Sequence, residues 1–160
     1  MKGFPLLRRT CLLALLTVSS SVLALEQVPA LDLDQLQPTR DQVVASQNTV
    51  ELLRRHHYNR TRLDDALSAQ MYDTYLKHLD PQRSLFTQQD IDAFSGNRLR
   101  LDDLLLQGDL SVGFAMHKRQ LQRLQDRLNF SIDLVENQLD GFDFNTDQDI
   151  LVDREEAPWA

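Results

Sequence analysis

The chain has 160 residues, of which 42% are hydrophobic, and a formal net charge of −7. One domain of ordinary size can bury a sufficient core at this length, whereas two full domains would be crowded. The acidic charge repels phosphate backbones and anionic lipid headgroups, which argues against nucleic-acid binding and peripheral membrane binding.

Residues 1–24 have the pattern of a secretory signal peptide. The pattern opens with three basic residues, Lys2, Arg8 and Arg9. An apolar run from Cys11 to Val18 follows, and Val22 and Ala24 occupy the positions that signal peptidase reads. We therefore expect cleavage after Ala24 and a periplasmic protein. The apolar stretch is shorter than the ~20 residues of a membrane-spanning helix, so no membrane span is expected after cleavage.

Removal of residues 1–24 changes the chemistry of the mature chain. Cys11 is the single cysteine, so the mature domain would have no thiol and would depend on its core alone. It would carry 14 basic against 24 acidic residues, a net charge of −10. This charge favours neutral or basic proteins as partners.

Residues 25–38 are expected to form a linker or a loosely docked arm, because they are acidic, contain Pro29 and Pro38 and lack a sustained apolar period. A first helix is predicted from Arg40 to His57. Thr39 and Gln42 have the spacing of a capping box, and apolar residues then recur at helical intervals.

A second helix is predicted to end at the Asp80-Pro81 step, because proline disfavours the helical conformation in the residue before it. Its expected buried face comprises Leu63, Leu67, Met71, Tyr75 and Leu79. A third helix is predicted from Thr87, which has Asp90 three positions on, to Gly108. Gly96 is expected to loosen the middle of this helix.

The strongest helical period runs from about Ser111 to Leu139. Apolar residues recur there at intervals of three, four and seven: Phe114, Leu121, Leu124, Leu128, Ile132, Val135 and Leu139. The polar residues between them, including Arg123 and Arg127, are expected to form a solvated face. At ~1.5 Å per residue this helix would exceed ~40 Å. It should be the spine on which the other helices pack, or protrude towards a missing partner domain.

The predicted fold class is therefore all-α: an antiparallel helical domain of about four helices with one long spine helix, spanning residues 39–141. Residues 142–160 are acidic and irregular in pattern, and no helix is predicted there.

The histidines do not have the spacing of a metal site. His56 and His57 are adjacent, so on a helix they point about 100° apart and cannot both hold one ion without distortion. His78 and His117 lack a histidine or acidic partner at the spacing of a zinc-protease helix. Hydrogen bonding of the imidazoles at a helix end or against Tyr58 is the better interpretation.

The acidic segment that begins at Asp143 resembles a calcium loop only in its first five positions. The sixth position needs glycine and holds Gln148, and the twelfth needs glutamate and holds Arg154. We therefore predict a solvated acidic turn, and no metal or cofactor in the chain.

Ser111 lies between two glycines as in a nucleophile elbow, but the first gap is one residue too long and no buried strand precedes it. Asp109 or Ser111 is better explained as a helix N-cap. Lys77 and Lys118 are predicted on polar helix faces, where nothing would desolvate an amine enough to make it a base. We therefore predict no catalytic residue in this chain.

Residues 57–94 closely resemble the opening of the N-terminal domain of tail-specific, or carboxy-terminal processing, proteases. The matching positions are His57-Tyr58, Leu63-Asp64, Ser68, Asp73-x-Tyr75-Leu76, Leu79-Asp80, and Asp90 ahead of Phe94. A second match, Asp153-Arg154-x-x-Ala157-Pro158-Trp159, resembles the segment that follows the long helix in that family. Both matches occur in the expected order, so the resemblance spans residues 39–160.

The resemblance implies a parent enzyme. Members of the family are periplasmic serine proteases with a Ser-Lys dyad, a PDZ domain that captures the substrate's carboxy terminus, and helical terminal regions that help form an enclosing bowl. They degrade or trim proteins with apolar, flexible C-termini, including cell-wall enzymes, and some work with a helical-repeat lipoprotein adaptor.

No counterpart of the dyad or of the PDZ motifs occurs in this sequence, and family members continue for several hundred residues. We expect a fragment, or a reading frame that ends early, that forms a non-catalytic structural and adaptor-docking module. Its expected partners are the PDZ and catalytic remainder of the protease, protein substrates and such an adaptor.

Two other functions stay open on the sequence alone. One is a free-standing periplasmic helical binding protein or chaperone from a truncated gene, which the downstream coding sequence would distinguish. The other is a small metal-dependent hydrolase that uses the histidines, which the metal content of the purified protein would decide.

Overall fold

The computed structural model describes residues 31–56, 62–138, 141–143, 145–147 and 149–159. These residues form helices joined by turns, and none of them lies in a β-strand, which confirms the all-α prediction. The predicted signal peptide, its cleavage site after Ala24, and His57 with Tyr58 lie outside the described residues.

Within the described ranges the chain forms five α-helices: α1 (Arg40–His56), α2 (Asp65–Leu79), α3 (Gln88–Ser95), α4 (Leu101–Gln107) and α5 (Ser111–Asp133). A short 3-10 helix, η1 (Leu33–Gln35), precedes them within the predicted linker. A π-helical turn, η2 (Leu134–Gln138), extends α5.

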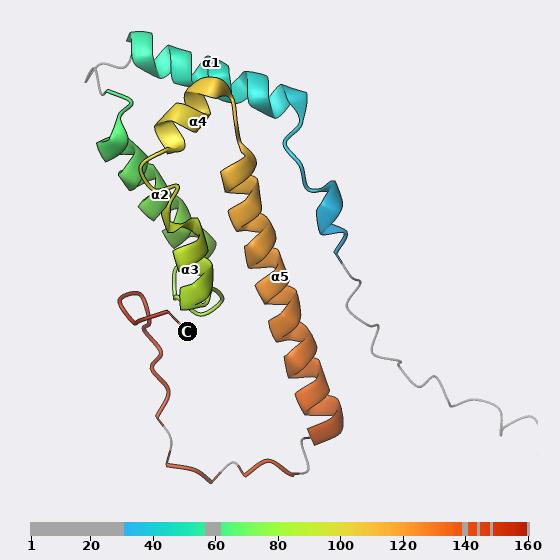
Figure 1. Ribbon diagram of the computed structural model, residues 1–160. Helices are drawn as coiled ribbons and strands as arrows, with labels where there is room; N and C mark the ends of the chain where they lie inside the picture. The colour runs from blue at the N-terminus through green and yellow to red at the C-terminus, as the bar shows by residue number, and fades with distance from the viewer. Residues whose placement is uncertain (1–30, 57–61, 139–140, 144, 148, 160) are drawn as a thin grey trace, which may run out of the picture.

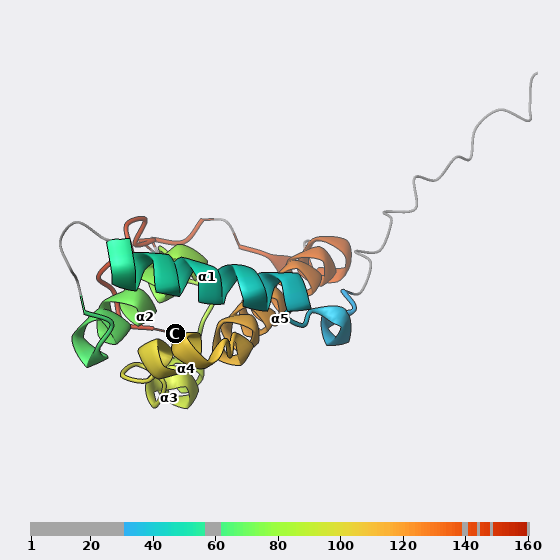
Figure 2. The same cartoon turned by 90° about the horizontal axis from the view of Figure 1, so that it is seen from above.

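The helices α2 and α5 form the two long sides of the domain (Figure 1). Helix α3 runs antiparallel to both, and α1 lies across the end at which α5 begins. The view from above shows α1 extending from α2 to α5 over α4 (Figure 2). Helix α4 contacts α1 and α2, and α3 contacts α5, so the shorter helices join the long ones into one body.

Local signals set several helix ends as predicted. Before α1, the Thr39 N–H donates to the Gln42 side chain at 2.8 Å, and the Gln42 N–H donates to the Thr39 hydroxyl at 3.3 Å. Thr87 and Asp90 form the second predicted capping box, at the start of α3. Gly108 ends α4 with a φ of 76°, a left-handed conformation that glycine adopts without steric cost.

The third predicted helix is divided in two, so the domain has one more helix than expected. Helix α3 ends at Ser95, and residues 96–100 form turns before α4 begins at Leu101. The buried Ser68 of α2 stabilises this break, because its hydroxyl donates to the Arg98 carbonyl at 3.0 Å and accepts from the Leu101 N–H at 2.8 Å. Gly96 thus interrupts the helix instead of only loosening it.

The core lies where α2, the turn after it and the first half of α5 meet. Its buried apolar side chains are Tyr72, Leu76, Leu79, Phe86 and Met116. The observed face of α2 begins at Ser68 and is offset by one residue from the face expected from the sequence. The expected residues Leu67, Met71 and Tyr75 are half-buried on the adjacent face, where Met71 and Tyr75 line a pocket with residues of α4 and of the start of α5.

The second half of α5 does not act as a packed spine. Leu124, Leu128 and Val135 are 39%, 42% and 59% exposed, whereas Met116 in the first half is fully buried. The expectation that the leucine stripe is buried among the other helices is therefore wrong. The other interpretation of the long helix, that it protrudes from the body, agrees with its extension beyond α3 in Figure 1.

Candidate functional site

The two lysines considered as candidate bases lie in different surroundings. Lys77 forms an ion pair with Glu155, and the hydrogen bond that Lys77 donates to the Glu155 carboxylate raises the pKa of Lys77. A raised pKa keeps the amine protonated, which is the opposite of what a general base requires. Lys118 is half-buried on α5.

Ser111 begins α5 and has a structural contact. Its N–H donates to the Asp109 carboxylate at 2.8 Å, and hydrogen bonds from the Ser111 side chain and backbone lower the pKa of Asp109. The N-cap residue is Leu110, and not Asp109 or Ser111 as predicted. The Asp109 carboxylate instead accepts its hydrogen bond from one residue before the N-cap. This carboxylate supplies an acceptor at the positive end of the helix dipole.

Two of the histidines in the described residues, His78 and His117, have local partners. His78 Nδ1 lies 2.7 Å from the Thr74 carbonyl near the end of α2, and His117 Nδ1 lies 2.9 Å from the Gln120 side-chain oxygen. His56 is exposed at the end of α1. In the described part of the chain, no group of three or more histidine, cysteine or acidic residues could hold a metal ion.

The acidic segment after η2 forms a local turn at Asp143, whose carboxylate accepts the Asn145 N–H at 2.9 Å. Gln148, which occupies the predicted glycine position of the calcium loop, lies outside the described residues. None of the helices that the structure describes is long and apolar enough to cross a membrane.

The most developed contact between distant segments joins residues 153–159 to the turn between α2 and α3. We call this contact the C-terminal clamp. The Arg83 guanidinium donates to the Ala157 carbonyl at 2.8 Å and lies 5.3 Å from the centre of the Trp159 ring. The Arg154 N–H donates to the Gln82 side chain at 2.8 Å. Hydrogen bonds and a cation–π contact therefore fasten this segment to the turn.

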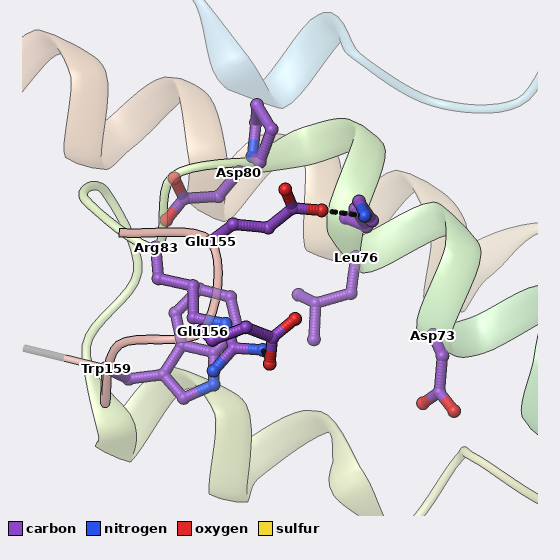
Figure 3. A pocket seen from close by; sticks show the side chains of 9 residues that line it. Asp73, Leu76, Asp80, Arg83, Glu155, Glu156 and Trp159 are labelled. Atoms are coloured by element: carbon purple, nitrogen blue, oxygen red, sulfur yellow. Dashed lines mark hydrogen bonds and ion pairs between the residues drawn. The ribbon is translucent and has the colours of Figure 1, made fainter. Parts of the chain in front are cut away.

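The clamp has an apolar side as well as a polar one. The Trp159 ring meets the fully buried Phe86 edge-on, with ring centroids 6.4 Å apart and an interplanar angle of 67°. Figure 3 shows Arg83 and Glu156 beside Trp159, and Glu155 on the same C-terminal segment, next to the end of α2. A cavity of about 300 Å³ lies between this segment and the end of α2. The clamp thus extends the core across residues that are more than 70 positions apart in sequence.

A buried carboxylate organises the turn that presents Arg83. Asp80 is only 2% exposed and accepts the N–H groups of Ser84, Leu85 and Phe86 at 2.8 to 2.9 Å. The turn places Arg83 at a φ of 46°, in the left-handed region. That conformation costs a residue with a Cβ about 1–2 kcal/mol, which the contacts of its side chain and of Asp80 must offset.

A second charged cluster joins α3 to α5. The Asp90 carboxylate is 5% exposed and accepts two hydrogen bonds from Arg123, at 2.8 and 3.1 Å. Burial raises the pKa of Asp90, but the hydrogen bonds from Arg123 and Thr87 outweigh it, and the net pKa is lowered. Arg119 adds a third charge at 3.4 Å. The expectation that Arg123 belongs to a solvated face is wrong, because Arg123 forms a bidentate ion pair with the buried Asp90 carboxylate.

The residues that carry the family resemblance hold the backbone in place. Asp64 caps α2, Ser68 bridges the break before α4, and the Tyr75 hydroxyl donates to the Gly113 carbonyl at 3.0 Å. Asp73 pairs with Arg98 through two hydrogen bonds of 2.6 and 2.9 Å, which lower the pKa of Asp73.

The partners of these residues were missed from the sequence. Arg83, Arg98 and Arg123 are isolated cations in helices or turns, and their acceptors lie 25 or more residues away. The second matching segment offered a signal for one of them, since it contains the single tryptophan of the chain beside an acidic pair.

Comparison with known proteins gives a consistent result. A family model described as the tail specific protease N-terminal domain matches residues 49–160. A tail-specific protease of Haemophilus influenzae is 32% identical over 115 residues, which cover 71% of this chain. The matched region is 16% of that relative, so the chain spans only a small part of its length.

Proposed function

Because the chain belongs to the family of tail-specific protease N-terminal domains, we propose that it is the non-catalytic, structural module of a tail-specific serine endopeptidase. In this proposal the Ser-Lys dyad and the substrate-capturing PDZ domain are supplied by the remainder of the parent protein. The parent degrades or trims proteins with apolar, flexible C-termini, including enzymes of cell-wall growth.

The match over residues 49–160 is the observation that carries this proposal, because it extends from within α1 to the end of the clamp. It therefore includes the Asp80 turn and the Asp90–Arg123 pair. These contacts make a frame with fixed helix positions, which is what a structural module must contribute to a larger enzyme.

We further propose that the protein acts in the periplasm after removal of residues 1–24, and that a helical-repeat adaptor docks on this module. The sequence pattern of residues 1–24 supports export. The acidic charge of the module supports docking of neutral or basic protein surfaces.

A cleavage assay on a reporter protein tests whether this segment is non-catalytic and the remainder of the parent protein carries the activity. The reporter carries a flexible C-terminal tail that ends in apolar residues, and a matched reporter ends in charged residues. We expect the intact polypeptide to cleave the apolar-tailed reporter faster, and the segment 25–160 to cleave neither.

The matched control is the intact polypeptide with residues 39–141 deleted, which should lose activity that the segment added in trans restores. Turnover by the segment alone that disappears in Ser111→Ala or Lys77→Ala would contradict the proposal. Full activity of the deleted polypeptide would contradict the structural role.

A further inference from the structure

The second half of α5 carries an apolar stripe that no described part of the chain covers. We define the α5 stripe as Leu121, Leu124, Leu128 and Ile132 of α5 together with Val135 of η2. Leu124, Leu128 and Val135 are 39%, 42% and 59% exposed, and Leu121 and Ile132 are half-buried. In Figure 1 this half of α5 extends past α3, with no other labelled helix beside it.

The α5 stripe lies to one side of the face that α5 turns towards the body of the domain. Helix positions advance by about 100° per residue, so residues three, four and seven apart share a face. The body is contacted by a different face, on which Gln120 donates to the Leu79 carbonyl at 2.6 Å and Arg127 donates to the Ser84 carbonyl at 3.1 Å. That face lies roughly 100° around the helix from the stripe. The stripe is thus a second, separate packing surface.

The spacing of the α5 stripe fits a helical partner. Leu121, Leu128 and Val135 are seven residues apart, and Leu124 lies between the first two. An interval of seven keeps one seam facing a neighbouring helix over several turns. Four polar residues that flank the middle of the seam are uncharged: Gln125, Asn129, Ser131 and Gln138. The charged residues Lys118 and Glu136 lie at its two ends. A second helix can therefore approach the middle of the seam with little desolvation of charge.

The charge around the α5 stripe selects between possible partners. From residue 133 to residue 149, the stretch at and after the C-terminal end of the stripe, there are six acidic residues and no basic residue. A second copy of the chain would bring an equally acidic segment to the interface, and like charges oppose that association. An anionic membrane is disfavoured by the same charge. A partner with lysine or arginine beside its apolar face is complementary.

We propose that the α5 stripe is the docking surface for an amphipathic helix of the same polypeptide, supplied by the part of the parent protease outside this domain. The proposal rests on the proposed function and adds the surface and the chemistry of its partner. The matched relative extends far beyond the region of similarity, which is 16% of its length, so such a segment is available in cis. The docked helix presents an apolar seam to the stripe and basic residues to the acidic residues 133–149.

Site-specific crosslinking in the intact polypeptide tests the inference. A benzophenone amino acid replaces Leu124 or Leu128, and the matched controls carry it at Gln122 or Asp126, which lie on other faces of α5. We expect crosslinks from the stripe positions, within the monomeric polypeptide, to one helical segment that contains basic residues. The controls should give none. Crosslinked dimers, crosslinks to a separate protein, or no crosslink at all would overturn the proposal.

A second variant separates docking from folding. Leu128→Glu places a charge on the seam, and Gln122→Glu places the same charge off it. We expect Leu128→Glu to abolish the crosslink from Leu124 and to expose the chain after residue 160 to limited proteolysis, while Gln122→Glu changes neither. Equal behaviour of the two variants would overturn the docking surface. If the crosslinks fail while deletion of residues 39–141 still abolishes cleavage, only this inference fails and the proposed function stands.

Discussion

Replacement of Arg123 by alanine should destabilise the domain more than replacement of Leu128 by alanine. Arg123 donates two hydrogen bonds to the buried Asp90 carboxylate, whereas Leu128 is 42% exposed. Apolar content alone would give the reverse order, because a leucine in a packed helix normally contributes more than a surface arginine. The comparison therefore tests the position of α5 in the structure.

The magnitude follows from what each substitution removes. A hydrogen bond to a charged group contributes about 1.5–3 kcal/mol to stability. Removing one member of a buried ion pair costs more than replacing both members, because the remaining charge is left buried without a partner. Asp90 retains Thr87 and Arg119 as partners, and Arg123 is itself 30% exposed. We therefore expect Arg123→Ala to lower the free energy of unfolding by ~2–3 kcal/mol. Full burial of a leucine is worth ~1.5–3 kcal/mol, so the exposed Leu128 should lose less than ~1 kcal/mol.

Urea unfolding of residues 25–160, followed by circular dichroism at constant protein concentration, measures both values. The double variant with Asp90→Asn adds a thermodynamic cycle, in which the loss from Arg123→Ala should shrink once its acceptor is uncharged. A larger loss for Leu128→Ala than for Arg123→Ala would refute the placement of the stripe on the solvent side. Additive losses for Arg123 and Asp90 would refute their direct contact.

Three further predictions follow from the same contacts. The pKa of Asp90 is lowered below 3.8 in the folded state, so the stability that its charge contributes is present above ~pH 4 and is lost as the pH falls through the folded pKa. The free energy of unfolding should therefore fall less steeply with decreasing pH in Asp90→Asn than in the wild type. An unchanged pH dependence would contradict this. Trp159 is the single tryptophan, so its fluorescence reports on the clamp. Arg83→Gly relieves the positive φ but removes the guanidinium that contacts the Trp159 ring. It should shift the tryptophan emission to longer wavelength while the helical circular dichroism signal is retained. Gly108→Ala should cost ~1–2 kcal/mol at its φ of 76°, whereas Gly96→Ala, with no atom within 4 Å of the added Cβ, should be neutral or slightly stabilising in thermal melts. Equal melting temperatures for the two glycine variants would argue against the left-handed end of α4.

The helix ends were predictable because their signals are local. Thr39, Thr87, the Asp80-Pro81 step and Gly108 act on backbone groups within a few residues, so their spacing in the sequence carries the information. The break at Gly96 was only partly visible. Its second cause is Ser68, which lies some 30 positions earlier and reaches the break only once α2 and α4 are packed together.

The charged contacts were not predictable from periodicity. Arg123 lies among polar residues between leucines, a pattern typical of a solvated helix face. Its acceptor, Asp90, was assigned only the role of a helix cap, and nothing local indicates that one carboxylate serves both purposes. The leucines of α5 led to the wrong prediction of a buried spine for a related reason. An apolar helix face indicates that something packs against it but does not identify the partner.

The contact of Trp159 was unpredictable for a topological reason. Arg83 and Trp159 lie in irregular segments that are separated by the helices α3, α4 and α5. A single aromatic residue near the end of an acidic segment belongs to no hydrophobic repeat, so periodicity cannot predict what it packs against. Only the order of the two matching segments indicated that they form one unit.

The C-terminal clamp also decides how mechanical load would pass through the domain. A pull on the chain beyond residue 159 is resisted first by the contacts of Arg83 with Ala157 and Trp159, and through them by the turn that Asp80 holds at the end of α2. The covalent path through α5 carries no load while the clamp is closed. Tension applied beyond residue 159 would therefore reach the core through α2, and it would reach α5 only after the clamp opens.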